Sequence, residues 1–413
     1  MGRFGVRDAI FAALFGCAAV SAAAAGADLP EGPGRETVAT VCASCHELQR
    51  ITASGHDRQG WQNVVAMMRN AGAPLPREKV DSVVTYLATH FPQKPQPAAV
   101  LVPGKVSVTI REWRVPTPGS RPHDPLATAD GALWYSGQMA NVLGRLDPQT
   151  GTFKEYGLPS NSGPHGLVAD AAGNIWYTAN FGGYIGRLDP KTGEVKQFKM
   201  PDPAARDPHS LVFDRAGILW FTVQGGNRLG RLDPKTGEVR LVVSPTPASR
   251  PYGIALDAGN GGQDVPFFVE FGSNKIGRID PATMQIREYV LPHRDARPRR
   301  IAITDDGIVW YTDYGRGMLG RLDPRTGSTQ EFASPGGPRS APYGLAARDG
   351  ILWYSESGVE PNTLVRFDPK TRAFQTWAIP SGGGVVRNMM ATPKGGLALA
   401  CSGVNGVALV DIR

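Results

Sequence analysis

The sequence predicts a multidomain protein in which a small all-α domain is followed by an all-β, seven-bladed propeller with four strands in each blade. Two observations predict this fold. The phrase Leu-Gly-Arg-Leu-Asp-Pro at residues 143–148 returns six more times, in full or degraded form, and its aspartates lie 42 to 47 residues apart. A repeat of this length with four short strand patterns is typical of propeller blades. Before residue 94, in contrast, apolar residues recur at helical spacing.

Residues 1–27 have the pattern of a secretory signal peptide. Arg3 and Arg7 precede an apolar run at residues 9–20, and small residues follow at positions 25–27. The apolar run is too short for a stable membrane span. We therefore expect a periplasmic protein without a transmembrane segment. A lipid attached at Cys17 is the alternative, which Phe15 beside the glycine disfavours.

The chain has a formal net charge of +7, and its basic residues are spread along the whole sequence. A basic surface favours anionic partners, including acidic redox proteins. No basic helix and no known module for reading nucleic acid appears in the sequence, so we expect no nucleic-acid partner.

The clearest chemical motif lies in the predicted helical domain, residues 28–93, and reads Cys42-Ala43-Ser44-Cys45-His46. Two cysteines three positions apart, followed at once by histidine, are the attachment pattern of c-type haem. Cys42 and Cys45 would bind the haem vinyl groups covalently, and His46 would bind the iron. The alternatives are a thioredoxin-like redox pair and half of a zinc site. The sequence shows neither a βαβ pattern nor a second pair of ligands nearby, which disfavours both.

The helical domain resembles the small class I cytochromes c. The residues that carry the resemblance are Trp61, Met68, Gly72-Ala73 and Tyr86-Leu87-Ala88. The resemblance implies haem c as cofactor, with the thioether of Met68 as the second axial ligand of the iron. The other candidates for this ligand are Met67, His56 and His90. In the alternative interpretation both methionines merely pack against the edge of the haem, because methionine fills irregular gaps well.

A proline-rich segment, residues 94–105, separates the two predicted domains. Prolines are closely spaced from Pro92 to Pro97. Such spacing favours the extended polyproline II conformation, which makes a semi-rigid spacer. The propeller is therefore expected to span residues 106–413.

Each repeat reads as four short strands, for example residues 165–170, 175–179, 184–188 and 194–199. The last repeat ends after its third strand, whereas residues 108–113 match the fourth strand of the other repeats. We therefore predict that this first strand completes the last blade. A tryptophan recurs once per blade in five blades and is predicted to pack between sheets. These residues are Trp134, Trp176, Trp220, Trp310 and Trp353.

The positions that vary between repeats point to a candidate site. One such position lies at the start of each inner strand, so its seven residues should form a ring at one mouth of the central channel. The ring residues are His123, His165, His209, Tyr252, Arg299, Tyr343 and Arg387. Each has an expected partner across the inner hairpin, and in order these are Gly137, Ala179, Val223, Glu270, Asp313, Glu356 and Cys401.

Three interpretations of the ring remain open. Histidines of neighbouring strands would bind a divalent metal, with Glu270 as a further ligand. Alternatively, the half that contains tyrosines, arginines and carboxylates would hold an anionic or polyhydroxylated small molecule, with a histidine or carboxylate as acid or base. In the third interpretation the polar residues form a solvated rim without a ligand.

The propeller resembles the virginiamycin B lyases, also called streptogramin lyases. The resemblance spans residues 106–413 and lies in Gly-x-x-Trp-[Tyr/Phe]-[Thr/Ser], in Ile/Leu-Gly-Arg-Leu-Asp-Pro-x-Thr-Gly and in the Glu-x-x-x-x-x-Pro that follows. It implies a seven-bladed, magnesium-dependent carbon–oxygen lyase. Such an enzyme opens a cyclic depsipeptide at its ester by elimination, with a ring histidine as base.

The same resemblance implies catalytic histidines at the ring position of the last two blades and a glutamate across the final hairpin. This chain has Tyr343, Arg387 and Cys401 at those positions. Neither tyrosine nor arginine replaces a neutral imidazole base well at neutral pH. Lyase activity would then depend on a histidine elsewhere in the ring. Cys401 is more typical of a small buried apolar residue than of a nucleophile.

From these patterns we expect an exported c-type cytochrome that carries electrons through covalently bound haem. In this hypothesis the propeller binds a small-molecule substrate or a redox partner protein, and the protein is an oxidoreductase or a subunit of one. The first alternative is a virginiamycin B lyase-type carbon–oxygen lyase with an accessory cytochrome domain. The second is a propeller that serves only as a docking platform.

Overall fold

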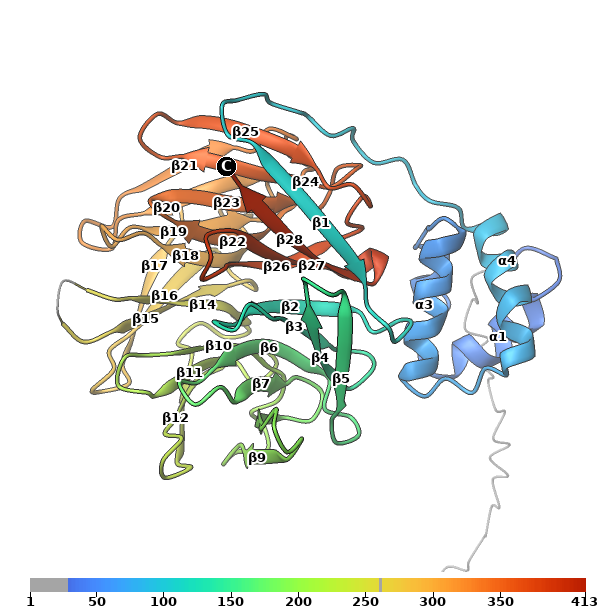
Figure 1. Cartoon of the computed structure of the whole chain (residues 1–413), viewed down its shortest axis with the longest axis horizontal. Coiled ribbons are helices and arrows are strands. Elements are labelled where there is room, and N and C mark those ends of the chain that lie inside the picture. Colours follow the sequence, from blue (N-terminus) through green and yellow to red (C-terminus); the bar gives the residue numbers. More distant parts are fainter. Residues whose placement is uncertain (1–28, 260–261) are drawn as a thin grey trace, which may run out of the picture.

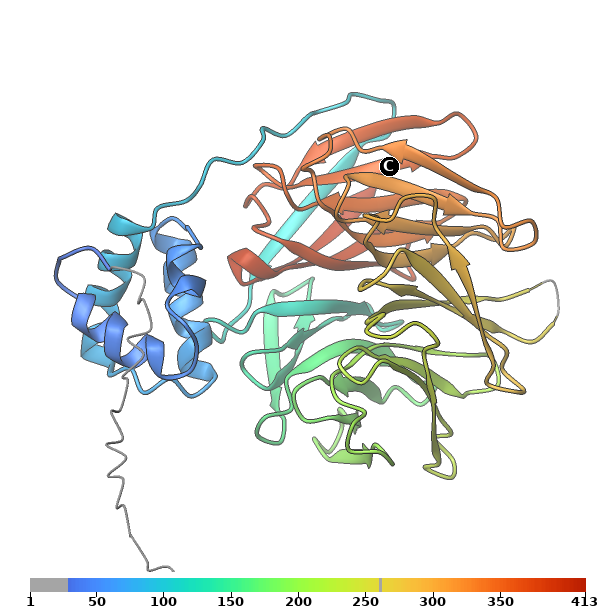
Figure 2. The ribbon, with the colours of Figure 1, turned by 180° about the vertical axis from the view of Figure 1, so that it is seen from behind.

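The computed structural model describes residues 29–259 and 262–413. The predicted signal peptide and Cys17 lie outside these residues. A small helical unit lies beside a much larger β-propeller (Figure 1), and Figure 2 shows the same two units from behind. In the part of the chain that the structure describes, no helix is long and apolar enough to cross a membrane.

The helical unit consists of short helices around one apolar core. The helices are α1 (Arg35–Val41), η1 (Cys42–Ser44), α2 (Gln49–Thr52), α3 (Arg58–Asn70), η2 (Arg77–Lys79) and α4 (Val80–His90). Asp57 caps α3, because its carboxylate accepts a hydrogen bond from the backbone N–H of Gly60 at 2.7 Å. The core includes Trp61, Val65 and Val83. The expected all-α character is confirmed, but a few short helices do not by themselves show a cytochrome c domain.

The propeller consists of antiparallel four-stranded sheets, and the predicted seven blades are confirmed. The first three blades are β2 (Pro122–Ala127), β3 (Leu133–Gly137), β4 (Val142–Asp147) and β5 (Thr152–Gly157); β6 (Pro164–Ala169), β7 (Ile175–Ala179), β8 (Tyr184–Leu188) and β9 (Val195–Lys199); and β10 (Pro208–Phe213), β11 (Leu219–Val223), β12 (Arg228–Leu232) and β13 (Val239–Val243). The next three are β14 (Pro251–Asp257), β15 (Val265–Glu270), β16 (Lys275–Ile279) and β17 (Ile286–Val290); β18 (Pro298–Ile303), β19 (Val309–Asp313), β20 (Met318–Leu322) and β21 (Thr329–Ala333); and β22 (Pro342–Arg348), β23 (Ile351–Glu356), β24 (Thr363–Asp368) and β25 (Ala373–Ala378).

The seventh blade closes the propeller in the predicted way. It contains β26 (Val386–Ala391), β27 (Leu397–Cys401), β28 (Gly406–Ile412) and, as its outer strand, β1 (Val108–Arg114). The pairing of β1 with β28 runs from Val108 opposite Ile412 to Arg114 opposite Gly406. The two ends of the propeller sequence therefore hold one sheet together, and the ring has no open blade.

The repeated sequence motif is explained by packing and turn geometry. A Cβ atom on Gly230 would lie 2.1 Å from the ring of Phe221 on the neighbouring strand, and equivalent conflicts occur at residues 144, 186, 277 and 320. The aspartate of the motif shapes the next turn, since Asp189 accepts a hydrogen bond from the N–H of Lys191 at 2.8 Å. The five recurring tryptophans are 1 to 3% exposed, which confirms their packing role. The motif thus specifies the fold and does not form a ligand site.

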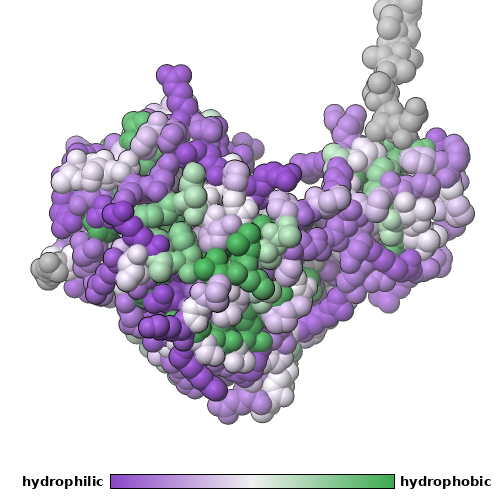
Figure 3. Space-filling model, turned by 90° about the horizontal axis from the view of Figure 1, so that it is seen from above, coloured by the Kyte–Doolittle hydropathy of each residue, from purple (hydrophilic) through white to green (hydrophobic). Residues whose placement is uncertain are grey.

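The proline-rich segment is attached to the propeller rather than free. Ala98 forms a parallel bridge with Glu360. Farther along, the N–H of Thr376 in β25 donates to the carbonyl of Val102 at 3.0 Å, and the N–H of Val102 donates to the Thr376 hydroxyl at 2.7 Å. The segment therefore covers the outer strand of the sixth blade before it enters β1, as Figure 1 shows. On the face of the propeller seen from above, apolar side chains gather in the middle and hydrophilic ones surround them (Figure 3).

Helix α3 connects the helical unit to the propeller. The side-chain amide of Asn63 donates to the carbonyl of Gly403 at 2.9 Å, and that of Asn70 donates to the carbonyl of Pro118 at 2.9 Å. Gly403 belongs to η3 (Ser402–Val404), which follows β27, and Pro118 precedes β2. The helical unit therefore docks at the end of the propeller where the inner strands begin.

The substitution Gly230→Ala tests the packing role of the motif. We expect it to lower the free energy of unfolding by about 1 to 3 kcal/mol, because the new methyl group would overlap the ring of Phe221. Gly157→Ala is the matched control, since a Cβ there meets nothing within 4 Å. Urea unfolding of both variants measures the difference, and equal stabilities would contradict the explanation.

Candidate functional site

Six of the seven predicted ring residues come into direct contact around the central channel. The ring centroids of His123 and His165 are 3.5 Å apart, those of His165 and His209 are 3.8 Å apart, and those of His209 and Tyr252 are 3.7 Å apart. The hydroxyl of Tyr252 lies 2.6 Å from that of Tyr343. The guanidinium carbon of Arg299 lies 3.9 Å from the centre of the Tyr343 ring.

A β-bulge at the start of every inner strand directs these side chains. In each blade the register of the inner hairpin shifts directly after its first pair, for example between Pro122 and Pro125 and between Pro342 and Leu345. A bulge changes the direction of a side chain relative to the direction it would have in a regular strand ladder. The ring position lies within this bulge in all seven blades.

The bulge also corrects the predicted partners across the hairpin. Glu270, Asp313 and Glu356 pair with the prolines that precede the ring residues, not with the ring residues themselves. Their side chains are fully buried, and each carboxylate accepts a hydrogen bond from the loop that leads into its blade. The donors are Ser244 and Ser273 for Glu270, the backbone of Arg297 for Asp313, and Ser334 and Thr363 for Glu356. These three carboxylates therefore do not join the ring, and they support the loops instead.

Cys401 pairs with Val386 and is fully buried. Burial raises the pKa of its thiol. The residue therefore behaves as the small apolar side chain that was expected, without a reactive thiolate.

A second layer, one residue deeper in the channel, was missed by the sequence analysis. Arg300 crosses the channel and donates to Asp124 Oδ1 at 2.9 Å and to Ser210 Oγ at 3.2 Å. Asp124 also accepts from Asn388 at 2.9 Å through Oδ2. The sequence contains a signal for this layer, since these four polar residues each come directly after a ring position.

Glycines occupy the same layer in the other three blades. A Cβ on Gly166 would lie 2.7 Å from the carbonyl oxygen of His209, and one on Gly253 would lie 3.0 Å from that of Arg299. Gly344 approaches the backbone of Asn388 in the same way. The small residues let neighbouring inner strands approach closely. The second layer therefore contains three close backbone contacts at glycines and the hydrogen-bonded network around Arg300.

The two ring tyrosines form a coupled acid pair in a positive environment. Burial alone would raise the pKa of Tyr343, but the guanidinium groups of Arg299, Arg387 and Arg300 outweigh it and lower that pKa to about 8. Burial and the neighbouring phenol raise the pKa of Tyr252 to about 12. The first proton of the pair therefore leaves near pH 8, and the Tyr252 hydroxyl then donates its hydrogen bond to the Tyr343 phenolate.

The three ring histidines are 2 to 3% exposed and neutral at pH 7. Burial lowers the pKa of each well below its usual value, and nearby arginines lower it further. His123 Nδ1 lies 2.9 Å from Asp124 Oδ1, and His209 Nδ1 lies 3.1 Å from Ser210 Oγ. His165 Nδ1 has no hydrogen-bond partner among the described residues. These imidazoles form a packed, uncharged wall of the ring.

A divalent metal does not fit the residues of the ring. His123, Asp124 and His165 bring ligand atoms within 4.8 Å of one another. Asp124 is the carboxylate of this group, but Arg300 and Asn388 already bind its two oxygens. A bound cation would lie beside the guanidinium of Arg300, and magnesium prefers several oxygen ligands. Glu270, the further ligand expected from the sequence, is held instead by hydrogen bonds from Ser244 and Ser273.

The predicted haem-attachment residues line an apolar cavity of about 290 Å³ in the helical unit. Cys42, Cys45, His46 and Met68 all border it, together with Trp61 and other core residues. His56 also borders the cavity, whereas Met67 and His90 do not. Cys42 and Cys45 are free thiols, and burial raises the pKa of Cys42. A raised pKa is the opposite of what a thioredoxin-like redox cysteine requires.

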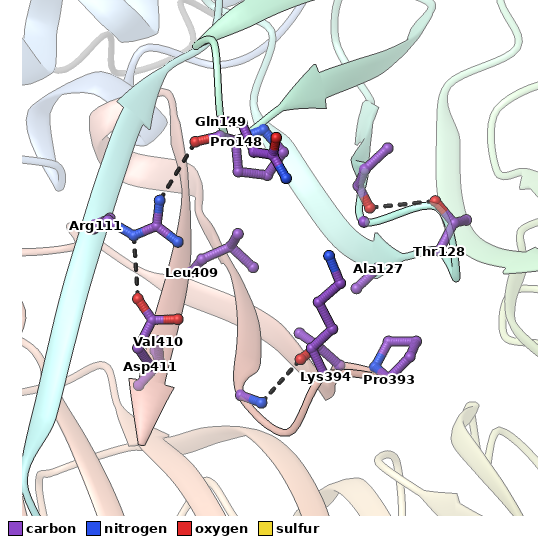
Figure 4. A pocket seen from close by; sticks show the side chains of 14 residues that line it. Arg111, Ala127, Thr128, Pro148, Gln149, Pro393, Lys394, Leu409, Val410 and Asp411 are labelled. Atoms are coloured by element: carbon purple, nitrogen blue, oxygen red, sulfur yellow. Dashed lines mark hydrogen bonds and ion pairs between the residues drawn. The ribbon is translucent and has the colours of Figure 1, made fainter. Parts of the chain in front are cut away.

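A smaller cavity, of about 170 Å³, lies between the first and seventh blades, at the other end of the inner strands (Figure 4). Arg111 crosses its edge and forms an ion pair with Asp411 at 3.2 Å. The loops that contain Thr128 and Lys394 form another part of its wall. Residues of β1 and β28, the two strands that close the propeller, line part of this cavity. None of the predicted site residues borders it.

Two overlapping matches to the virginiamycin B lyase family, at residues 107–366 and 267–412, cover the propeller. The chain belongs to this family. A streptogramin B lyase structure is similar to it with a TM-score of 0.67 and 26% identity, over 74% of this chain and 98% of that one. The virginiamycin B lyase of Staphylococcus aureus has a TM-score of 0.66 and 24% identity, over 74% of this chain and 99% of that one. A catalytically inactive histidine-to-alanine variant of the same enzyme, with quinupristin, has a TM-score of 0.65 and 24% identity. The match covers 74% of this chain and 99% of that one. No curated protein gives a significant match.

These comparisons correct the function expected from the sequence. The family matches lie wholly in the propeller, and the similar structures named above are lyases. The prediction of a cytochrome whose main role is to carry electrons is therefore wrong, and the alternative of a lyase-type propeller fits better. A five-residue motif is a weaker indicator of the function of the whole chain than repeats that fill most of it.

The buried histidines should make the protein sensitive to acid. Because folding lowers their pKa, the unfolded chain binds more protons below about pH 6.5, so the free energy of unfolding falls as the pH drops. Each histidine contributes up to about 1.4 kcal/mol per pH unit. The raised pKa of Glu270 acts in the opposite direction, so the comparison is made between variants.

We expect His165→Gln to unfold with a weaker pH dependence than the unsubstituted protein between pH 6.5 and 5. Urea unfolding at several pH values measures this. His293→Gln is the control, because its side chain is 51% exposed. An unchanged pH dependence in His165→Gln would show that this imidazole does not stay neutral through folding.

Proposed function

We propose that the propeller is a carbon–oxygen lyase that acts by elimination at the mouth formed by the ring residues. Membership of the virginiamycin B lyase family supports a lyase. The observation that carries the proposal is the pair of Tyr343 and Tyr252. Their hydroxyl oxygens lie 2.6 Å apart, and the guanidinium of Arg299 stacks on the Tyr343 ring. This pair supplies a base near neutral pH, and the arginines supply positive charge for the anion that develops.

Tyr343 is the proposed base. It occupies the ring position of the sixth blade, where the family resemblance implies a catalytic histidine. A phenol of ordinary pKa would be a poor replacement, but the lowered pKa makes the phenolate available near pH 8. The stacked histidines are weaker candidates, because their pKa values lie well below 6.5 and His123 is bound to Asp124.

The elimination balances without a further reactant. The phenolate of Tyr343 removes a proton from the carbon next to a carbonyl or carboxylate group. The electron pair of that C–H bond forms a carbon–carbon double bond, and the bond from the next carbon to its oxygen substituent breaks. The oxygen leaves with the bonding electrons and is then protonated. Tyr343 is only 1% exposed, so side chains around it must move when substrate binds.

The substitution Tyr343→Phe tests the base. We expect kcat to fall at least about 100-fold, because general-base catalysis is lost. In the unsubstituted enzyme the rate should rise with pH and level off above about pH 8. Ultraviolet absorption of the new double bond measures the rate on a panel of β-acyloxy and β-alkoxy esters and acids that includes quinupristin.

Tyr156→Phe is the matched control. The hydroxyl of Tyr156 donates to the carbonyl of Pro190, in the turn after β8 of the second blade, away from the ring. Equal rates for Tyr343→Phe and the control would show that Tyr343 is not the base. A panel with no product from the unsubstituted protein would contradict the lyase itself and favour a docking platform.

We also propose that the helical unit is an accessory domain that holds haem c, in an exported protein. The shared lining of one apolar cavity by Cys42, Cys45, His46 and Met68 supports this cofactor. Cys42 and Cys45 would hold the group covalently, and His46 and Met68 would bind its iron. The bound group would supply a redox-active iron. No step of the elimination passes through it.

Expression in a host that attaches haem tests the accessory domain. We expect a coloured protein, and a colourless one when Cys42→Ala and Cys45→Ala are combined. Met68→Leu should change the visible spectrum, whereas His90→Ala, which lies outside the cavity lining, should not. A colourless unsubstituted protein with both thiols free would refute haem attachment and leave the lyase proposal standing.

A further inference from the structure

Three arginines at the ring mouth lack a carboxylate partner among the described residues. Arg121, Arg299 and Arg387 form none of the ion pairs found within 4 Å, whereas Arg300 is paired with Asp124 at 2.9 Å. The guanidinium carbons of Arg299 and Arg300 lie 3.9 Å and 5.9 Å from the centre of the Tyr343 ring. The charge of Arg387 also lowers the pKa of Tyr343. The mouth therefore holds more positive charge than the protein itself neutralises.

The fold holds each of these arginines in place. Arg299 stacks on Tyr343 at 3.9 Å and on Tyr314 at 4.2 Å, and its buried Nε has no hydrogen-bond partner. Arg387 donates through Nε to Ser402 Oγ at 2.9 Å. Stacking and single hydrogen bonds orient a guanidinium but leave its other donors free.

Arg121 is held by its backbone. It adopts a left-handed conformation with φ of 54°, and its N–H donates to Asn405 Oδ1 at 3.1 Å. Burial and then the charge of Arg387 lower the pKa of its guanidinium to about 10. Arg121 precedes the first blade and Arg387 lies in the seventh blade beside it. An anion bound between two neighbouring guanidinium groups that repel each other stabilises both of them.

We infer that the ring mouth is a carboxylate site, in which Arg121, Arg299 and Arg387 bind the acid group of an anionic substrate beside Tyr343. The inference rests on the proposed lyase function and names its substrate class: a carboxylic acid with an oxygen leaving group on the β carbon. When Tyr343 removes the proton next to the carboxylate, negative charge develops on the carboxylate oxygens. The arginines stabilise that charge, so the reaction needs no divalent cation.

Binding of benzoate tests the site without any turnover, and benzamide is the uncharged control ligand. We expect benzoate to bind in calorimetry at constant ionic strength and benzamide not to bind. Bound benzoate should also move the phenolate titration of Tyr343 to higher pH, because it neutralises the arginines that favour the phenolate.

The variants Arg121→Gln and Arg387→Gln should each weaken benzoate binding at least tenfold. Arg240→Gln is the matched control, because Arg240 is exposed and paired with Glu238 at 2.8 Å on an outer strand. Equal binding of benzoate and benzamide, or equal affinity in the ring and control variants, would overturn the inference.

The outcomes separate this inference from the proposed function. Benzoate binding that depends on the ring arginines, without elimination on any acid of the panel, would support the carboxylate site and contradict the lyase. Elimination of neutral esters at the same rate as the matching acids would support the lyase and overturn the carboxylate site. Loss of elimination after treatment with EDTA would also overturn the carboxylate site, because the arginines would then not replace a divalent cation.

Discussion

The buried ion pair between Arg300 and Asp124 is the interaction on which the ring depends. It joins the fifth blade to the first across the channel, and Ser210 and Asn388 extend it to the third and seventh. A charge pair in such a place is stable only when its remaining donors and acceptors are also bonded. Removal of either partner would leave the other charged and buried. The pair therefore closes the channel below the ring and fixes the orientation of His123.

The ring residues are separate from the features that specify the propeller fold. The blades, the turn motifs and the closure through β1 and β28 belong to the fold of this chain, and the similar lyase structures share that fold over 74% of the chain. The ring residues lie in bulges that tolerate different side chains, because they are not part of the regular ladder. In this chain those positions bring together tyrosines and arginines on one side and neutral histidines on the other. The proposed base and its positive environment lie on the side with the tyrosines and arginines.

Helix α3 gives the helical unit a defined place beside this site. Trp61 and Met68 border the apolar cavity, whereas Asn63 and Asn70 bind the propeller near the start of β2. The segment before β1 adds a second attachment along the sixth blade. Two separate attachments restrict rotation of one unit against the other more than a single linker does. The cavity and the ring mouth are therefore held at the same end of the propeller.

The sequence by itself determined the seven blades, the strand that completes the last one, the packing of the tryptophans and the positions of the ring, because these follow from local strand patterns and repeat spacing. It did not determine the function, since the pentapeptide at Cys42 is a local signal that says nothing of the repeats. Only the tertiary structure decided that Glu270, Asp313 and Glu356 turn away from the ring, because the bulge shifts the register by one residue. It alone joined Arg300 to Asp124, 176 residues away, and Tyr252 to Tyr343, 91 residues away. The lowered pKa of Tyr343 depends on such distant neighbours, and no pattern in the sequence near Tyr343 contains them.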